Sequence, residues 1–366
     1  MPIPRSSEIG KEGKISADPI AKPLAALERH PEGNDPNELL KHRYLCRGGG
    51  LLLAGPTGVG KSSISMQMAI SWALGRSAFD IEPVGPLSSL VIQSENDDGD
   101  LAEVRDGVLS GLKLNDTDRS AACEKIWVCR HDSTTGANFC ETVLRRLLER
   151  HKPDLVWIDP VLGYLGGEAS AQSDVSNFLR SGLNPLIREF ECGIVLIHHT
   201  NKPPTNKNNR REWSGSEFAY LGSGSIEWAN WPRAVLALQP KGEGVFELIA
   251  AKRGDRLHWE KQEGVRTNSV LIAHSKEPDC ICWNMADPSL IQSKGRPKSR
   301  DEQEILHLLP SSGLTASEWE KRAKENLGIS KSTFHRSRRQ LEKQSKVERD
   351  AEGKWIPCGS GVTSSQ

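Results

Sequence analysis

The sequence predicts an α/β protein in which helices cover both faces of a mostly parallel sheet, followed by a small second domain. Two observations lead to this prediction. Continuous apolar runs alternate with helical stretches through the larger part of the chain, which is typical of parallel strands buried on both faces. After Asp287, a stretch rich in Pro, Ser, Lys and Arg separates this region from three helical segments and a hairpin.

The elements of the larger region follow from its apolar runs. We expect residues 36–45 (PNELLKHRYL) to form a short helix that packs Leu39, Leu40 and Leu45. Parallel strands are then expected at 50–55, 88–95, 125–131, 154–160 and 193–200, with helices at 61–75, 98–113, 138–151 and 173–190. Three short strands should extend the sheet in antiparallel fashion, at 233–240, 244–252 and 256–264. The polar, basic segment 200–217 is too long for an ordinary connection, and we expect a functional or mobile loop there.

Composition shifts predict the domain boundaries. The expected parts are a flexible arm at 1–34, the α/β domain at 35–286, a linker at 287–300, a helical domain with a hairpin at 301–358 and a flexible tail at 359–366. With 366 residues and 36% apolar residues, the chain can bury a sizeable core.

Composition also excludes some classes of protein. No apolar run approaches the ~18 residues that cross a bilayer, and the N-terminal stretch has no apolar centre typical of a secretion signal. We therefore expect a soluble, cytoplasmic protein without a membrane partner. The eight cysteines lack paired zinc spacing, so we expect reduced thiols, with the alternating Cys280–Cys282 stretch in a strand.

Charge is distributed unevenly along the chain. The formal net charge is zero, but residues 294–349 contain 14 Lys plus Arg and 8 Asp plus Glu, a local balance of 14 − 8 = +6. The rest of the chain is therefore at −6. A basic C-terminal region on a mildly acidic body indicates an anionic partner.

The stretch GPTGVGKSS matches the phosphate-loop pattern G-x-x-x-x-G-K-[ST]. In this pattern backbone N–H groups surround phosphate oxygens, the lysine supplies a mobile charge and the serine hydroxyl reaches Mg²⁺. A fortuitous Gly-rich turn is the alternative, but a strand precedes the stretch and a helix follows it, as the motif requires. The predicted ATP-binding residues are Gly55, Thr57, Gly58, Gly60, Lys61, Ser62 and Ser63.

Two carboxylates end predicted strands and are candidates for metal binding and catalysis. Asp159 can hold a Mg²⁺-bound water across from Ser62. Glu95 is placed to polarise a water that attacks the terminal phosphate. Alternatively Glu95 caps the next helix, although Asp97 and Asp98 can do this instead.

A polar cluster follows the strand expected at 193–200. His198 and His199 are candidate sensors of the terminal phosphate that move the following loop. A shared metal is disfavoured, because adjacent strand residues point to opposite faces.

The order of these parts resembles the RecA-like ATPase core, and within it the hexameric plasmid RepA and DnaB-type helicase branch, over about residues 36–275. The resemblance depends on QSEND around Glu95, on GSGSIEWANWPRAVLAL (222–238) and on LIAAKRGDR (248–256). It implies a ring, commonly of six subunits, with ATP and Mg²⁺ between them. Lys252 and Arg253 then act on the neighbour's nucleotide, with Arg233 and Arg256 as alternates; a solvent-facing basic turn is the competing interpretation.

In this family the loops after the Asp159 and His199 strands face a central channel. The second loop has Lys202, Lys207, Arg210 and Arg211, which suit the phosphates of single-stranded DNA, and Trp213, which can stack on a base. A disordered basic loop is the alternative. The chain departs from the large replicative helicases in having no room for their N-terminal collar domain.

The C-terminal segment predicts a winged helix, a helix-turn-helix relative. Gly328 suits the turn, Ser330 the helix N-cap, and Phe334 and Leu341 the inner face. The outward residues are expected to bind duplex DNA and include Lys331, Thr333, Arg336, Arg338 and Arg339. A protein-docking winged helix is the alternative.

Together these features favour an ATP-driven DNA helicase or translocase for replication of a plasmid, phage or other mobile element. A second hypothesis is an ATP-switched DNA-binding regulator or recombination mediator that assembles without unwinding. A signalling or defence ATPase is a third.

Overall fold

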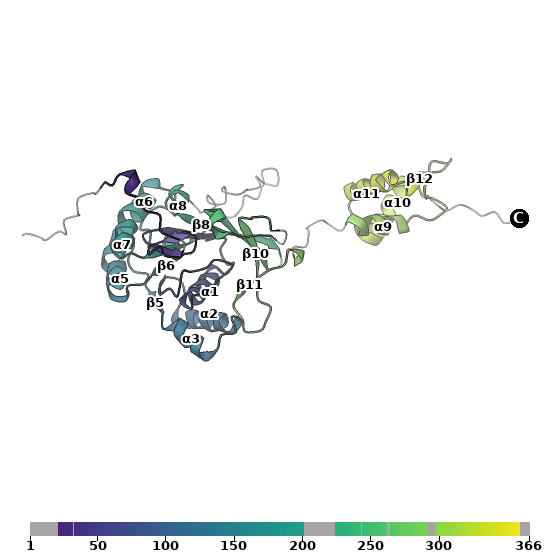
Figure 1. The fold of residues 1–366 in the computed structure, drawn as a ribbon. Helices are drawn as coiled ribbons and strands as arrows, with labels where there is room; N and C mark the ends of the chain where they lie inside the picture. The colour runs from purple at the N-terminus through teal and green to yellow at the C-terminus, as the bar shows by residue number, and fades with distance from the viewer. Residues whose placement is uncertain are drawn as a thin grey trace, which may run out of the picture. The chain divides into compact units, whose positions relative to one another are not determined.

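The computed structural model describes residues 21–31, 33–200, 224–242, 244–261, 264–290 and 298–358. The chain divides into two compact units, Met1–Leu290 and Ile291–Gln366, which are described separately (Figure 1). No helix within the described ranges is long and apolar enough to cross a membrane.

The first unit is built on a nine-stranded sheet with the order β11-β10-β9-β8-β3-β7-β6-β4-β5. Six strands run parallel: β3 (Gly50–Gly55), β4 (Ser89–Gln93), β5 (Ile126–Arg130), β6 (Leu155–Asp159), β7 (Gly193–His199) and β8 (Ala234–Gly242). This confirms the predicted α/β fold class, including all five of the expected parallel strands.

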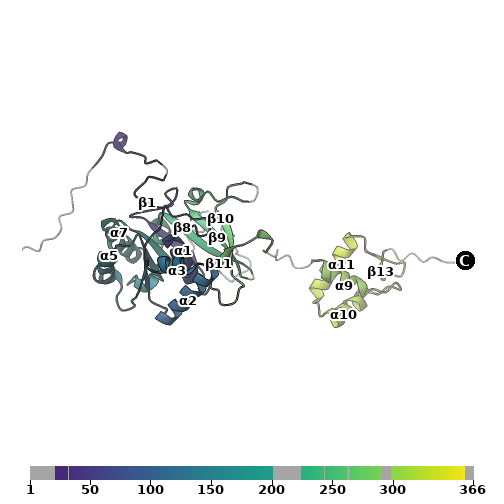
Figure 2. The same cartoon turned by 60° about the horizontal axis from the view of Figure 1, so that its bottom comes forward.

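Three antiparallel strands extend the sheet: β9 (Val245–Lys252), β10 (Ser269–His274) and β11 (Trp283–Met285). In Figure 2 they lie on the side of the sheet away from α5 and α7. The strand expected at 256–264 is wrong: Arg253 and His258 have φ of 61° and 56°, which breaks the extended chain around the 3-10 helix η7 (Gly254–Leu257). The strand expected at Cys280–Cys282 is also wrong, since β11 begins one residue later.

Helices cover both faces of the sheet because its strand residues alternate between two cores. Leu51 and Leu53 pack with one set of helices, while Leu52 and Ala54 pack with the other. The first set is α1 (Lys61–Ala73), α2 (Asp98–Gly111) and α3 (Asp116–Cys123). The second is α4 (Gly136–Asn138), π-helix η2 (Phe139–Leu144), α5 (Arg145–His151), α6 (Gln172–Ser176), π-helix η4 (Asn177–Leu183) and α7 (Asn184–Glu189), seen beside the sheet in Figure 1. The π segments interrupt the two helices expected at 138–151 and 173–190, and α3 was not expected.

The helix expected at 36–45 is wrong, because this segment forms a hairpin. Its strands are β1 (Glu38–Leu40) and β2 (Leu45–Cys46). His42 and Arg43 between them have φ of 58° and 56°, a left-handed conformation that no α-helix accommodates. The three leucines are buried as expected, but from strands.

Short elements connect these parts. They are the 3-10 helices η1 (Leu24–Ala26), η3 (Val161–Tyr164) and η8 (Pro288–Leu290), and helix α8 (Glu227–Asn230).

The second unit has three helices and a two-stranded antiparallel sheet. These are α9 (Lys298–His307), α10 (Ala316–Leu327), α11 (Lys331–Lys343), β12 (Val347–Arg349) and β13 (Trp355–Pro357). Gly328 ends α10 with φ of 63°, and the Ser330 side chain accepts a hydrogen bond from the Thr333 N–H at the start of α11. Phe334 and Leu341 are buried in the core of this unit. The predicted elements of this segment are therefore confirmed.

Gly50, at the start of β3, provides a test of this packing. An added methyl group would overlap the Trp231 indole, which is held by a 2.9 Å hydrogen bond from its Nε1 to Asn184 Oδ1. We expect Gly50→Ala to lower the free energy of unfolding of the first unit by ~2 kcal/mol, measured by urea denaturation. Gly85→Ala is the control, because nothing lies within 4 Å of its added methyl group. Equal stability of the two variants would contradict this packing.

Candidate functional site

The phosphate loop connects the end of β3 to the start of α1. Gly58 and Gly60 have φ of 76° and 87°, values that side chains with a Cβ adopt only with strain. Gly60 is the N-cap of α1, so the first N–H groups of the helix face the loop without intrahelical partners. The loop is therefore a ready anion site, and its positive groups come from the backbone as well as from Lys61.

Lys61 is buried and fully engaged by its own loop. Its Nζ donates to the carbonyl oxygens of Gly55 at 3.1 Å and Pro56 at 2.7 Å, and lies 2.9 Å from His199 Nδ1. Burial lowers the pKa of Lys61 to about 8, although the carboxylates of Asp159 and Glu95 oppose this shift. A bound phosphate would supply the negative charge that this ammonium lacks.

Asp159, the last residue of β6, is buried beside the loop. Burial raises the pKa of its carboxyl, and a hydrogen bond with the Ser62 side chain and the charge of Lys61 act in the opposite direction. Gln93 Nε2 on β4 donates to Asp159 Oδ2 at 3.4 Å. The pair of Ser62 hydroxyl and Asp159 carboxylate is the oxygen donor set that Mg²⁺ prefers.

Glu95 is exposed at the end of β4, close enough to Lys61 and Asp159 to influence their pKa values. It does not cap the next helix, because the Asp97 side chain accepts from the Asp100 N–H in a capping box. Its backbone is set by Gln93, whose Oε1 accepts from the N–H of Ser94 at 2.9 Å and of Glu95 at 3.1 Å.

Gln93 was missed by the sequence analysis. The signal available there was a polar residue within the apolar run LVIQ, which is fully consistent with an ordinary strand end. Only the pairing of Gln93 with Asp159 across β4 and β6 reveals its place in the site.

The two histidines at the end of β7 point to opposite faces. His199 lies at the loop, where its Nδ1 is 3.3 Å from Thr57 Oγ1 as well as 2.9 Å from Lys61 Nζ. His198 is buried against Trp228 with ring centroids 4.7 Å apart, and its Nδ1 bonds the His199 carbonyl. Burial lowers the pKa of His198 to about 4, so it is neutral and lies away from the phosphate loop. Of the two expected sensors, the structure brings only His199 to the site.

Ser63 also departs from its expected role. Its hydroxyl donates to the Gly60 carbonyl at 2.8 Å and accepts from Trp283 Nε1 at 3.0 Å, so it faces the protein interior. Only the backbone of Ser63 remains available to a phosphate.

The basic turn after β9 lies at the opposite edge of the sheet. Because β9 runs antiparallel to β8, and β8 parallel to β3, Lys252 lies where β3 begins, whereas the phosphate loop follows the end of β3. Lys252 Nζ donates to the carbonyls of Ala229, Asn230 and Pro232 at 2.8–3.2 Å, which holds it against its own chain.

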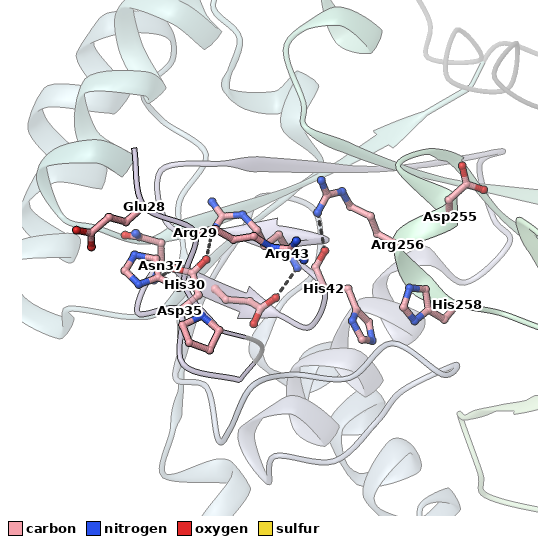
Figure 3. A pocket seen from close by; sticks show the side chains of 12 residues that line it. Glu28, Arg29, His30, Asp35, Asn37, His42, Arg43, Asp255, Arg256 and His258 are labelled. Atoms are coloured by element: carbon pink, nitrogen blue, oxygen red, sulfur yellow. Dashed lines mark hydrogen bonds and ion pairs between the residues drawn. The ribbon is translucent and has the colours of Figure 1, made fainter. Parts of the chain in front are cut away.

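Arg253 and Arg256 anchor this turn to the β1–β2 hairpin. Arg253 Nη1 donates to the Arg43 carbonyl at 2.9 Å and Arg256 Nη1 to the His42 carbonyl at 2.8 Å. Figure 3 shows the resulting cleft of about 740 Å³, in which the His42 and His258 rings lie side by side. Burial lowers the pKa of Arg253, and the nearby charges of Arg256 and Arg233 lower it further, which marks a concentration of positive charge.

The remaining expected residues fall in other parts of the chain. Lys202, Lys207, Arg210 and Arg211 lie outside the described residues. On α11, Lys331, Arg336 and Arg339 are exposed, with Lys331 also 3.8 Å from Glu320. Arg338 was expected to point outward but is half-buried, with its guanidinium 5.0 Å from the Trp355 ring centroid. Arg105 forms a surface ion pair with Asp106, as expected.

The fold and this site define a class. A phosphate loop that leaves a central parallel strand, with a buried aspartate ending a nearby strand, is the nucleotide site of a RecA-like P-loop ATPase. The chain belongs to the AAA domain family AAA_25, whose model matches residues 21–205. The match includes Lys61, Glu95, Asp159 and His199 and ends before β8.

Comparison with solved structures finds distant similarity. The ATPase domain of a helicase is 14% identical, with a TM-score of 0.45 and coverage of 66% of this chain and 86% of the other. The "Crystal structure of the RadB recombinase" is 12% identical, with a TM-score of 0.37 and coverage of 63% and 88%. No curated protein sequence matches significantly. These scores are too low to transfer an activity.

The pKa of Lys61 predicts a pH dependence of nucleotide binding. Because a bound phosphate favours the charged ammonium, its pKa should rise from about 8 on binding, so binding takes up a proton at pH 8.5. Affinity for ADP should then fall as the pH rises above 8, by up to ~10-fold per pH unit. Calorimetric titrations in two buffers with different ionisation heats measure the proton uptake.

Lys61→Arg is the matched control, because a guanidinium stays charged throughout this range. Its affinity for ADP should lose the dependence above pH 8, whatever its absolute value. Proton uptake by the control equal to that of the wild type would contradict the assignment to Lys61.

Proposed function

We propose that this protein is a ring-forming, ATP-dependent DNA helicase or translocase that acts in replication of a plasmid, phage or other mobile element. The observation that carries the proposal is the separation of the phosphate loop and the arginine-rich turn at opposite edges of one sheet. One chain cannot bring these groups together, whereas a head-to-tail ring can.

The residues around the loop suit ATP with Mg²⁺. The N–H groups of the loop and Lys61 bind the β- and γ-phosphates, and Ser62 and Asp159 hold the metal side. Mg²⁺, when bound, neutralises charge on the phosphates. Glu95, exposed and next to both Lys61 and Asp159, orients the attacking water and accepts its proton.

The neighbouring subunit completes this site with a positive charge. Arg253, with Arg256 and Arg233 nearby, is the proposed group that stabilises charge on the transferring phosphoryl. Lys252, bonded to three carbonyls, supports the turn in this arrangement and reaches the nucleotide only if those bonds are released.

DNA contacts are proposed for two regions. Lys202, Lys207, Arg210 and Arg211 follow β7 directly after His199, so a change at the phosphate can reach a loop that holds single-stranded DNA in the channel of a six-subunit ring. The second unit has the helices and hairpin of a winged helix, with Lys331, Arg336 and Arg339 exposed on α11 for duplex DNA.

A second candidate is an ATP-switched DNA-binding regulator or recombination mediator. It is favoured by the basic helix α11 in a unit that packs its own core, separate from the ATPase unit. Strand separation on forked DNA distinguishes the two: robust ATPase without unwinding would favour the regulator.

Mixing of variants tests the inter-subunit site. We expect Lys61→Ala and Arg253→Ala each to lower DNA-stimulated kcat by ~10²–10³-fold, because each removes charge from the phosphoryl group. Lys61→Ala and Arg253→Ala proteins mixed together should recover part of the activity, since some interfaces then contain both intact halves. Phosphate release is the measurement.

Lys276→Ala, at an exposed lysine outside the turn, is the control and should retain full activity alone. Recovery in the mixture no greater than the sum of the separate variants would argue against a shared site.

The DNA-binding helix is tested by salt dependence. We expect Arg336→Ala/Arg339→Ala to weaken duplex binding and to reduce the slope of log K against log salt by ~2, one for each lost phosphate contact. Fluorescence anisotropy of labelled duplex measures both. Arg322→Ala/Lys324→Ala on α10 removes the same charge from another exposed helix face and should leave the slope unchanged. Equal slopes for the two double variants would contradict the role of α11.

A further inference from the structure

A buried contact connects helix α1 to the edge strand β11, which three strands separate from β3. The side chain of Gln67 in α1 forms two hydrogen bonds with the backbone of Trp283. Its Nε2 donates to the Trp283 carbonyl at 2.8 Å, and its Oε1 accepts from the Trp283 N–H at 2.7 Å. A helix side chain therefore takes the place of a neighbouring strand and fixes β11 against α1.

The Trp283 side chain continues this contact to the phosphate loop. Its Nε1 donates to Ser63 Oγ at 3.0 Å, and Ser63 Oγ donates to the Gly60 carbonyl at 2.8 Å. Both Ser63 and Trp283 are buried, so water cannot replace either bond readily.

The Gly60 carbonyl determines the direction of a phosphate-binding group. It also accepts from the Ile64 N–H at 3.1 Å, so two donors hold its orientation. Because the peptide bond is planar and trans, the Lys61 N–H points the opposite way from this carbonyl. That N–H is among the groups at the start of α1 that face a bound phosphate.

Aromatic rings pack against the same loop residue. Trp283 pairs with His274 across β10 and β11, and their ring centroids are 3.8 Å apart. A Cβ at Gly60 would lie 3.0 Å from both His274 Cε1 and Trp283 Cζ2. The His274 imidazole also hydrogen-bonds the Val59 backbone. The loop is therefore packed directly against the β10–β11 edge and cannot shift toward it.

From these contacts we propose that Trp283 is a positioning residue for nucleotide binding, which sets the phosphate loop through Ser63 and Gly60 while Gln67 seats the strand. The inference rests on the proposed ATPase function. Trp283 acts on phosphate affinity and leaves the catalytic step to Glu95 and Asp159, which it does not contact.

Trp283→Phe tests this role, because it retains an aromatic ring and removes only the indole donor. We expect the Kd for ADP and the KM for ATP each to rise about fivefold, the effect of one hydrogen bond, with kcat unchanged within about twofold. Calorimetric ADP titration and steady-state phosphate release on the full chain measure these values.

Trp259→Phe is the matched control. Trp259 is also buried, and its Nε1 donates to the Asp80 carbonyl at 3.3 Å, so the same kind of bond is lost away from the loop. It should lower the melting temperature as Trp283→Phe does, but leave the Kd for ADP at the wild-type value.

Ser63→Ala breaks the same connection without altering the aromatic packing. It should raise the Kd for ADP by a similar factor, and Ser63→Ala/Trp283→Phe should be no weaker than either single variant, because both act through one chain of bonds. Additive effects, or a Kd for Trp283→Phe equal to that of Trp259→Phe, would overturn the positioning role alone. A wild-type protein that binds neither ADP nor ATP would overturn the ATPase proposal as well.

Discussion

Parallel pairing of β4, β6, β7 and β3 is the constraint on which the site depends. Parallel strands end at the same edge of a sheet, so the residues that follow them meet there. Gln93 pairs directly with Asp159, and Gly55 with His199, in the hydrogen-bonded register. The phosphate loop, the buried aspartate and the histidine therefore converge although they lie up to 144 residues apart (199 − 55). A change of register by one residue would turn each strand-end side chain to the opposite face.

The same sheet also separates charges. Antiparallel β9 returns the chain to the edge where β3 begins, and the arginines of the following turn are anchored there by carbonyls of the β1–β2 hairpin. Four residues around this turn and hairpin, His42, Arg43, Arg253 and His258, adopt left-handed backbone conformations, a cost that their mutual contacts offset. This rigid basic edge faces away from the chain's own phosphate loop, which makes assembly a geometric requirement for any site that uses both.

The phosphate loop is ordered by protein contacts on all sides. Lys61 is held by two loop carbonyls and His199 on one side, and the Gly60 peptide by Ser63 and the β10–β11 edge on the other. A preformed loop loses little conformational entropy when phosphate binds. The burial that lowers the pKa of Lys61 also leaves an ammonium in need of an anion, so order and charge favour the same ligand.

The sequence by itself determined the parallel strands, the helix that follows the phosphate loop, and the roles proposed for Lys61, Asp159 and Glu95, because these depend on local patterns of apolar residues, glycines and strand ends. Tertiary structure decided which histidine faces the loop, that Gln93 supports both carboxylates, that Lys252 is bonded to its own chain and that residues 36–45 form a hairpin. The contact of Trp283 with Gln67 and Ser63 spans 216 and 220 residues. No local pattern encodes such contacts, because they arise only when the sheet order brings a distant edge strand against α1.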